Sequence, residues 1–184
     1  MELYGSLTSP YVRHCRIALM QSQLSFKLIL TDQTQSAQLI ATQRVPFLKD
    51  RDVTLSDSAS ILRYIREKSG QTFLNTVEEL DKFCFVNTVL DSTANLFYLE
   101  KFGLDQQANA YTQRQNNRIH GSLLELENSL LSFQAVNDWH LRLACFLDWA
   151  IFRHRVQADN YPNLCQFLQQ AQQYKIFALT HPTE

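Results

Sequence analysis

The sequence lacks the features that mark several classes of protein. It contains no block of lysine and arginine, and its net charge of -1 gives no basic surface for nucleic acid or an anionic membrane. Its longest nearly apolar run, residues 143–152, is too short to span a bilayer and contains Asp148. Its N-terminus has no basic segment followed by a long apolar run, which predicts no secretion signal. Together these absences predict a cytoplasmic protein that binds neither nucleic acid nor membrane.

Closely spaced cysteines are absent as well. The chain has four cysteines but no Cys-x-x-Cys pair: Cys15, Cys84, Cys145 and Cys165. Metal sites need ligands that lie close together in the sequence, so we expect no bound metal. Each cysteine lies among apolar residues at a helix-like position, which predicts four reduced thiols with mainly structural roles.

Apolar residues are plentiful, and in the first part of the chain they alternate between strand and helix patterns. Hydrophobic residues make up 45% of the sequence and charged residues 19%, which is enough to bury a core. The predicted order of elements is a strand at residues 2–4, a helix from Pro10, a strand at 25–30, a short helix within 32–42, strands at 45–48 and 53–55, and a helix from Ser56 to near Gly70. This order indicates a small α/β domain.

The second part of the chain shows only helical periodicity. We expect helices over residues 77–102, over a stretch that includes Ile119, Leu123, Leu126, Leu130 and Phe133, over residues 139–155, and after Pro162. Residues 139–155 are apolar nearly all round, which places this helix at the centre of a bundle. Asp148 within it is expected to be a buried hydrogen-bonding residue or to mark the polar side of a cleft. A composition shift within residues 70–78 predicts an α/β domain over 1–72 and an all-helical domain over 78–184.

The stretch from Tyr4 to Arg13 is the strongest local signal for a binding site. Gly5 breaks the first strand, and Pro10 fits the first turn of a helix, where its missing N–H costs nothing. Ser9 directly precedes this proline, at the position where a side-chain oxygen caps the helix. A small hydroxyl at the positive end of a helix can also hold an anion, including a thiolate. On these residues alone, a helix cap is the simpler interpretation.

Three segments of the chain resemble the glutathione S-transferase superfamily, in particular its small bacterial serine-type members. They read SPYVRHCRIAL (residues 9–19), RVPFL (residues 44–48) and LSDSASILRYI (residues 55–65). Their order and spacing are similar to those of the family, and the all-helical second part fits its other domain. The resemblance implies a thioredoxin-like domain followed by a helical bundle.

The resemblance also implies how the thiol of glutathione would be activated. Ser9 would donate to the sulfur and favour the thiolate. Tyr4 and Tyr11 are the alternative hydroxyls, because other members of the family use tyrosine. Tyr4 also fits strand packing, and Tyr11 fits the helix surface or a wall of the site.

Five further residues would form the binding site for the glutathione tripeptide. Val45, before a cis Pro46, would present its backbone N–H and C=O to the cysteinyl part. Ser58 would bind the γ-glutamyl carboxylate at a helix start, and Asp57 would face the ammonium group, although both could also simply cap the helix. Arg44 would pair with the glycyl carboxylate or remain an exposed surface arginine.

The function implied is that of a homodimeric enzyme with glutathione as its co-substrate. It would transfer glutathione to small electrophiles, as in detoxification, without a metal. The alternative is a non-catalytic relative that acts through protein contacts, as in the stringent starvation protein A type. A thioredoxin-like disulfide reductase is the weakest of the three, because Ser9 stands where the redox cysteine would be.

Overall fold

The computed structural model describes residues 1–104, 109–129 and 131–182. The chain divides into two compact units, Met1–Asn75 with the residues from Gln172 onward, and Thr76–Ala171. We describe each unit by itself. The sequence-based division assigned residues 78–184 to one helical domain, whereas the residues from Gln172 onward lie with the first unit.

The first unit contains a four-stranded mixed sheet. Its strands are β1 (Glu2–Gly5), β2 (Lys27–Leu30), β3 (Phe47–Asp50) and β4 (Val53–Leu55), in the spatial order β2-β1-β3-β4. β1 is parallel to β2 and antiparallel to β3, and β3 forms an antiparallel hairpin with β4. The strands therefore appear where the sequence predicted them, with different ends: β1 includes Gly5, β2 begins at Lys27 rather than Ser25, and β3 covers Phe47–Asp50 rather than residues 45–48.

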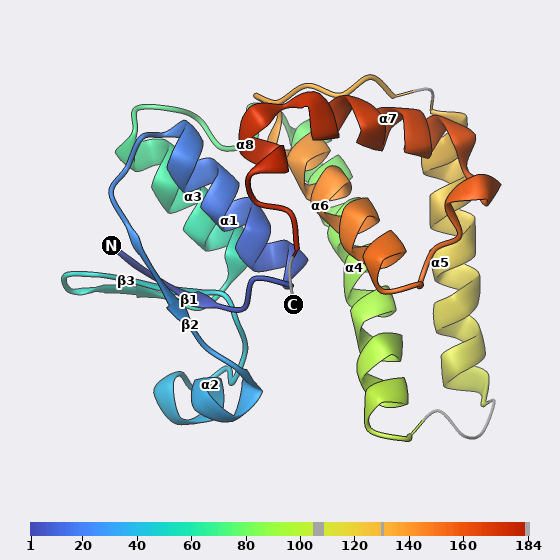
Figure 1. The fold of residues 1–184 in the computed structure, drawn as a ribbon, viewed down its shortest axis with the longest axis horizontal. Helices are drawn as coiled ribbons and strands as arrows, with labels where there is room; N and C mark the ends of the chain where they lie inside the picture. Colours follow the sequence, from blue (N-terminus) through green and yellow to red (C-terminus); the bar gives the residue numbers. More distant parts are fainter. Residues whose placement is uncertain (105–108, 130, 183–184) are drawn as a thin grey trace. The chain divides into compact units, whose positions relative to one another are not determined.

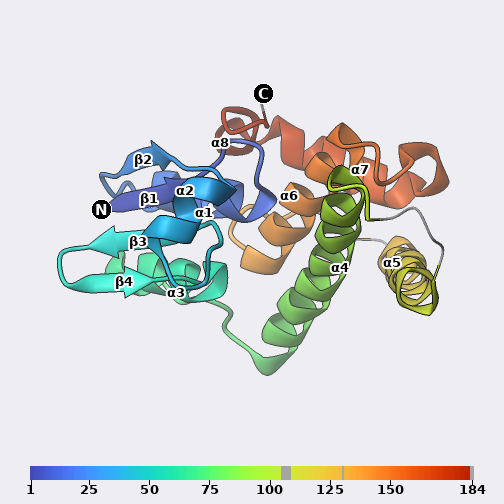
Figure 2. The same ribbon diagram turned by 90° about the horizontal axis from the view of Figure 1, so that it is seen from below.

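Helices cover both faces of this sheet. α1 (Pro10–Gln21) and α3 (Ser58–Lys68) pack against each other on one face, and α2 (Gln33–Leu39) lies on the other (Figures 1 and 2). Leu3 and Leu48 from the two central strands are fully buried, as are Ile17 and Ile61 from the two helices. Together these elements form the expected thioredoxin-like domain.

Gly5 explains how closely α1 approaches the end of β1. A Cβ atom at this position would lie only 2.3 Å from Cγ2 of Val12. Only glycine leaves room for the first turn of the helix against the strand. Gly5, which was interpreted from the sequence as a strand break, is the last residue of β1, and it allows α1 to pack closely against the strand.

The second unit is all-helical (Figure 1). Its elements are α4 (Val77–Lys101), α5 (Ala110–Asn128), α6 (Asp138–Phe152), the 3-10 helix η1 (Ala158–Asn160) and α7 (Pro162–Gln173), whose residues up to Ala171 belong here. α4 packs against both α5 and α6. Every residue from Asp138 to Ala150 is buried, Asp148 included, which confirms α6 as a buried helix.

The environment of His140 shows how thoroughly α6 is buried. Its Nδ1 accepts a hydrogen bond from the N–H of Gln134 at 3.1 Å, and its ring meets those of Trp139 and Phe167 edge-on. Burial lowers the pKa of His140 to about 4. The imidazole is therefore neutral at physiological pH and serves as a packed acceptor.

The sequence prediction was wrong about the end of α5. The helix stops at Asn128, so Phe133 lies beyond it, and Leu130 lies outside the described residues. Phe133 instead packs edge-to-face on Phe167, with ring centroids 5.6 Å apart. Phe133 continues the apolar spacing of the sequence because it packs on α7, not because it belongs to α5.

The cysteines are all free but differ in exposure. Cys15 and Cys145 are buried and Cys165 is half-buried, whereas Cys84 is exposed on α4. The expected structural role therefore does not apply to Cys84, whose apolar sequence neighbours face other directions. Among the residues that the structure describes, none of the helices combines the length and apolarity needed to cross a membrane.

Candidate functional site

Ser9 is the N-cap of α1. Its backbone is extended (φ -75°, ψ 124°), and its Oγ accepts a hydrogen bond from the N–H of Val12 at 3.3 Å. Within the described part of the chain this hydroxyl donates its own hydrogen to no group, and the side chain is half-buried. Ser9 thus caps the helix as an acceptor and still has a hydrogen to donate.

The first turn of α1 favours a negative charge beside Ser9. Pro10 occupies its first position, and no acidic residue lies in this turn. The helix dipole gives such a terminus a partial positive charge. A thiolate placed against Ser9 would meet a hydrogen donor and a favourable potential at once.

Strand register brings a second element to the same end of the sheet. Tyr4 pairs with Phe47 in the antiparallel β1–β3 ladder, so the residues after Gly5 lie next to the residues before Phe47. Those residues are Pro46, which is buried, and Val45, which is half-buried. The peptide bond between them is cis, which confirms the prediction.

The register of β4 brings a third element there. Leu55 pairs with Leu48, so the chain leaves β4 at the end of the sheet where β3 begins. Asp57 follows as the N-cap of α3, and its Oδ1 accepts from the N–H groups of Ala59 at 2.8 Å and Ser60 at 3.3 Å. Two helix N-termini and the cis bond therefore lie at one end of the sheet.

The cap residues of α3 differ in exposure. Asp57 is exposed, and within the described residues its second carboxylate oxygen, Oδ2, accepts no hydrogen bond. Ser58, the first residue of the helix, is 8% exposed. An acceptor open to solvent thus stands next to a buried hydroxyl at a positive helix end.

The remaining candidates are placed less centrally. Arg44 is exposed and makes no ion pair in the part of the chain that the structure describes, and Tyr11 is half-buried on α1. The Tyr4 hydroxyl donates to the Glu2 carboxylate at 2.7 Å, and its ring stacks on Phe47 with centroids 4.3 Å apart. That hydrogen bond, followed by burial, raises the pKa of Tyr4, so its proton is held firmly and is already engaged.

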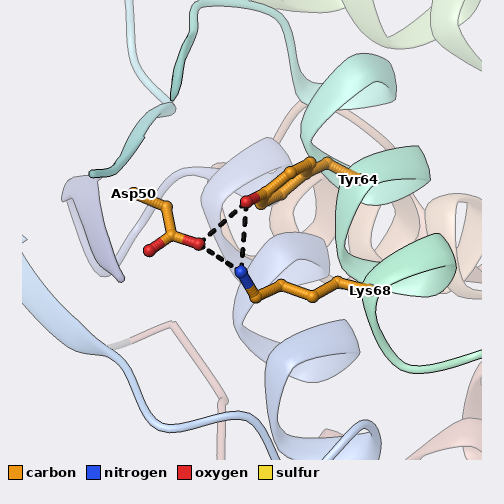
Figure 3. Close-up of polar contacts among 3 residues, drawn as sticks. All are labelled: Asp50, Tyr64 and Lys68. Atoms are coloured by element: carbon orange, nitrogen blue, oxygen red, sulfur yellow. Dashed lines mark hydrogen bonds and ion pairs between the residues drawn. The ribbon is translucent and has the colours of Figure 1, made fainter. Parts of the chain in front are cut away.

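A polar cluster that the sequence analysis missed lies at the opposite end of the sheet. Oδ2 of Asp50, the last residue of β3, accepts from the Tyr64 hydroxyl at 2.8 Å and from Lys68 Nζ at 2.6 Å (Figure 3). Lys68 Nζ also donates to the Tyr64 oxygen at 3.2 Å. Tyr64 and Lys68 are one turn apart on α3, a spacing visible in the sequence. The cluster joins the β3–β4 hairpin to α3.

The cluster shifts the pKa values of both charged members. Lys68 donates to Asp50 and lowers the pKa of its carboxyl, and the same contact raises the pKa of Lys68. Both partners are therefore charged over a wide pH range, and Oδ2 of Asp50, the Tyr64 hydroxyl and Lys68 Nζ bond to one another. This arrangement is structural.

The helical unit contains a hollow of its own. It has a volume of about 290 Å³ and is formed by the end of α4 and the start of α5. Its lining residues are Asn95, Tyr98, Leu99, Phe102, Leu104 and Tyr111. Separately, no group of acidic, histidine or cysteine side chains suited to a metal ion occurs among the described residues.

Comparison with known proteins gives one family match. Residues 3–73, which contain all the candidate site residues, match the N-terminal domain of glutathione S-transferases. A search of curated proteins finds no match.

Solved structures match over the whole chain. A glutathione S-transferase from Methylobacillus flagellatus KT with glutathione bound is 19% identical, with a TM-score of 0.86 and 99% of each chain covered. A glutathione S-transferase from Methylobacterium radiotolerans JCM 2831, in complex with glutathione sulfonate, is 18% identical at a TM-score of 0.85, covering 100% of this chain and 95% of the other. A glutathione transferase family member from Pseudomonas fluorescens Pf-5, with bound S-(propanoic acid)-glutathione, is 20% identical at a TM-score of 0.84, with both chains fully covered (100%).

Proposed function

We propose that this chain is a member of the glutathione S-transferase superfamily that binds glutathione and activates its thiol for attack on small electrophiles. In this reaction the thiol loses its proton, and its sulfur then forms a bond to the electrophilic atom of the second substrate. The product is a glutathione conjugate. No metal takes part in the proposed reaction.

One observation carries this proposal: the register of β1, β3 and β4 brings two helix N-termini to the same end of the sheet as the Val45–Pro46 bond. Glutathione carries two carboxylates, an ammonium group and a thiol. The positive ends of α1 and α3, with the half-buried Val45 beside them, match the thiolate and the γ-glutamyl carboxylate of the tripeptide. The solved structures with bound glutathione or its derivatives have the same fold.

Ser9 is the residue that we propose activates the thiol. A free thiol has a pKa of about 8.5, so only a small fraction is thiolate at neutral pH. The unused hydrogen of the Ser9 hydroxyl would donate to the sulfur, and the positive end of α1 would add to this effect. Tyr4 is the poorer donor, because its hydroxyl already donates to Glu2.

The other site residues are proposed to hold the tripeptide. Ser58, at the positive end of α3, would bind the γ-glutamyl carboxylate, and the open Oδ2 of Asp57 would accept from the ammonium group. Val45 would pair through its backbone with the cysteinyl part, and Arg44 would reach the glycyl carboxylate. Tyr11, on the first turn of α1, would form a wall of the site.

The direct test is to measure binding of glutathione by calorimetry, and conjugation of a generic aromatic electrophile such as a chlorodinitrobenzene. Saturable binding at millimolar glutathione or below, with turnover that depends on Ser9, supports the proposal. Absence of binding at millimolar concentration would overturn it. The stringent starvation protein A type of function, which works through protein contacts, would then take its place.

We also propose that the protein is a homodimer in the cytoplasm. Four exposed apolar residues lie at helical spacing along α4 and at its C-cap: Val77, Leu80, Tyr98 and Phe102. A second copy covering this face would remove these side chains from water. The four free cysteines fit a reducing compartment. Light scattering at micromolar concentration tests the assembly, and a clean monomer would contradict it.

A further inference from the structure

The C-terminal segment of the chain, residues 174–182, packs on α1 within the first unit. It contains the short helix α8 (Lys175–Ala178), which lies against α1 (Figure 1). Phe177 and Thr180 are 0% and 1% exposed, and Pro182 is also buried. A segment distant in sequence therefore supplies part of the core of the α/β unit.

Arg13 on α1 is the centre of this contact. Its side chain is only 2% exposed. Its Nε donates to Thr180 Oγ1 at 3.2 Å, and a terminal nitrogen donates to the Phe177 carbonyl at 3.0 Å. Its guanidinium carbon also lies 3.8 Å from the centre of the Phe177 ring, a cation–π arrangement. Burying a guanidinium is costly without such partners, so Arg13 depends on this segment.

A second contact ties the other end of α1 to the same segment. Gln21, the last residue of the helix, donates from Nε2 to the Tyr174 hydroxyl at 3.2 Å. The Oε1 of Gln21 accepts from Arg66 of α3 at 2.7 Å. The segment is thus attached to α1 near both helix ends.

The first turn of α1 connects Arg13 directly to Ser9. The N–H of Arg13 donates to the Ser9 carbonyl at 2.9 Å, and the N–H of Val12 donates to the Ser9 hydroxyl. Val12 also lies close to Gly5 of β1, where even a Cβ atom would clash with it. The turn that presents Ser9 is therefore held by the strand on one side and by residues 177–180 on the other.

We propose that Arg13 is a positioning residue, which works with Phe177 and Thr180 to fix the first turn of α1 and hence the Ser9 hydroxyl. This inference rests on the proposed function of Ser9. Arg13 itself touches neither glutathione nor the electrophile in this scheme. Its effect is to keep the Ser9 hydrogen aimed at the sulfur in the catalytic step, whereas the tripeptide is held mainly elsewhere.

The test changes the contact from the C-terminal side. Thr180→Val keeps the shape of the side chain but removes the acceptor for Arg13 Nε, together with the donor to the Phe177 and Ile176 carbonyls. We expect amide hydrogen exchange of Val12 and Arg13 to rise roughly tenfold, as for loss of one hydrogen bond to a charged group. We also expect kcat to fall about three- to tenfold, the thiolate absorbance of bound glutathione to fall with it, and KM for glutathione to stay within about twofold.

Leu179→Ala is the matched control, because Leu179 belongs to the same segment but is 63% exposed. It should leave exchange, kcat and thiolate absorbance unchanged. Arg13→Met should reproduce the effects of Thr180→Val from the helix side, and it covers the case in which one variant folds poorly.

Two results would overturn the proposal. One is unchanged exchange of Val12 and Arg13 in both variants. The other is faster exchange with unaltered kcat and thiolate absorbance, because the contact would then serve stability alone. If the wild type binds no glutathione, the proposed function fails separately, and the exchange measurement still decides whether this contact fixes the turn.

Discussion

The two ends of the four-stranded sheet use their polar groups in opposite ways. At the end where β3 meets β4, Asp50, Tyr64 and Lys68 engage one another (Figure 3). At the other end, the Ser9 hydroxyl has an unused hydrogen, and the exposed Asp57 carboxylate forms no ion pair within the described residues. Polar groups that the protein satisfies itself stabilise the fold, whereas groups left open at a helix end are available to a ligand. The predictions below test this contrast.

Ser9→Ala should have the largest effect. It removes the donor to the sulfur but little ground-state binding, so glutathione affinity should remain nearly unchanged. A hydrogen bond to a charged group is worth about 1.5–3 kcal/mol, so kcat should fall by roughly one to two orders of magnitude. Steady-state conjugation kinetics measure kcat and the KM for glutathione, and ultraviolet titration measures the pKa of the bound thiol.

Ser9→Thr is the control for this prediction. Threonine keeps a hydroxyl and can still cap α1, so it should retain most of the turnover. If Ser9→Ala leaves both the rate and the thiol pKa unchanged, Ser9 is a helix cap and nothing more. Tyr11 or a backbone N–H would then be the next candidate for activating the thiol.

Ser58→Ala should come second and should act on binding. Its proposed partner is a carboxylate that is present in the ground state and the transition state alike, so the loss appears in affinity rather than in kcat. We expect the Kd for glutathione to rise about tenfold, measured by calorimetry. Ser60→Ala is the matched control, because Ser60 is exposed on the same turn and its hydroxyl donates to the Asp57 carbonyl. An equal effect of both variants would indicate damage to the turn instead of a lost ligand contact.

Lys68→Met should have a smaller effect and none on glutathione. Lys68 lies at the end of the sheet opposite to Ser9, and its ion pair with Asp50 is partly exposed. Partly exposed pairs contribute little, so the melting temperature should drop by no more than a few degrees. Glutathione affinity and kcat should match the wild type. A large loss of activity in Lys68→Met would contradict the assignment of a purely structural role to this end of the sheet.

The pH dependence of this same pair gives the smallest expected signal. The hydrogen bond from Lys68 lowers the pKa of Asp50 from its ordinary value of 3.8. The contact therefore stabilises the fold fully when the pH is above 3.8. Its contribution is lost as the pH falls through the lowered pKa of the folded state. The difference in melting temperature between wild type and Asp50→Asn should therefore be constant at neutral pH and shrink below about pH 4. A difference that grows on acidification would contradict this assignment.

The sequence predicted the parts of the site that depend on local chemistry. Ser9 before Pro10, and Asp57 before an apolar helix, are cap signals that act over three or four residues, and both residues are caps in the structure. The cis bond before Pro46 followed from the family resemblance rather than from physical reasoning. Their meeting at one end of the sheet needs the strand register, which the sequence does not state directly.

The features that were missed depend on contacts between distant residues. Arg13 reads as one more polar residue on an amphipathic helix, because its partners Thr180 and Phe177 lie 167 and 164 residues away. Phe133 continued an apolar spacing, yet its partner is Phe167 on another helix. Local periodicity records that a side chain is buried, but not what buries it.

The exposure of Cys84 gives the protein a natural chemical label. Its thiol is the exposed one of the four cysteines, and it lies on α4 between Leu80 and Tyr98. A maleimide reagent should therefore modify one site quickly, without any engineered substitution. If two copies meet along this face of α4, the same thiol should react slowly at high protein concentration and quickly after dilution, so its reaction rate would report assembly directly.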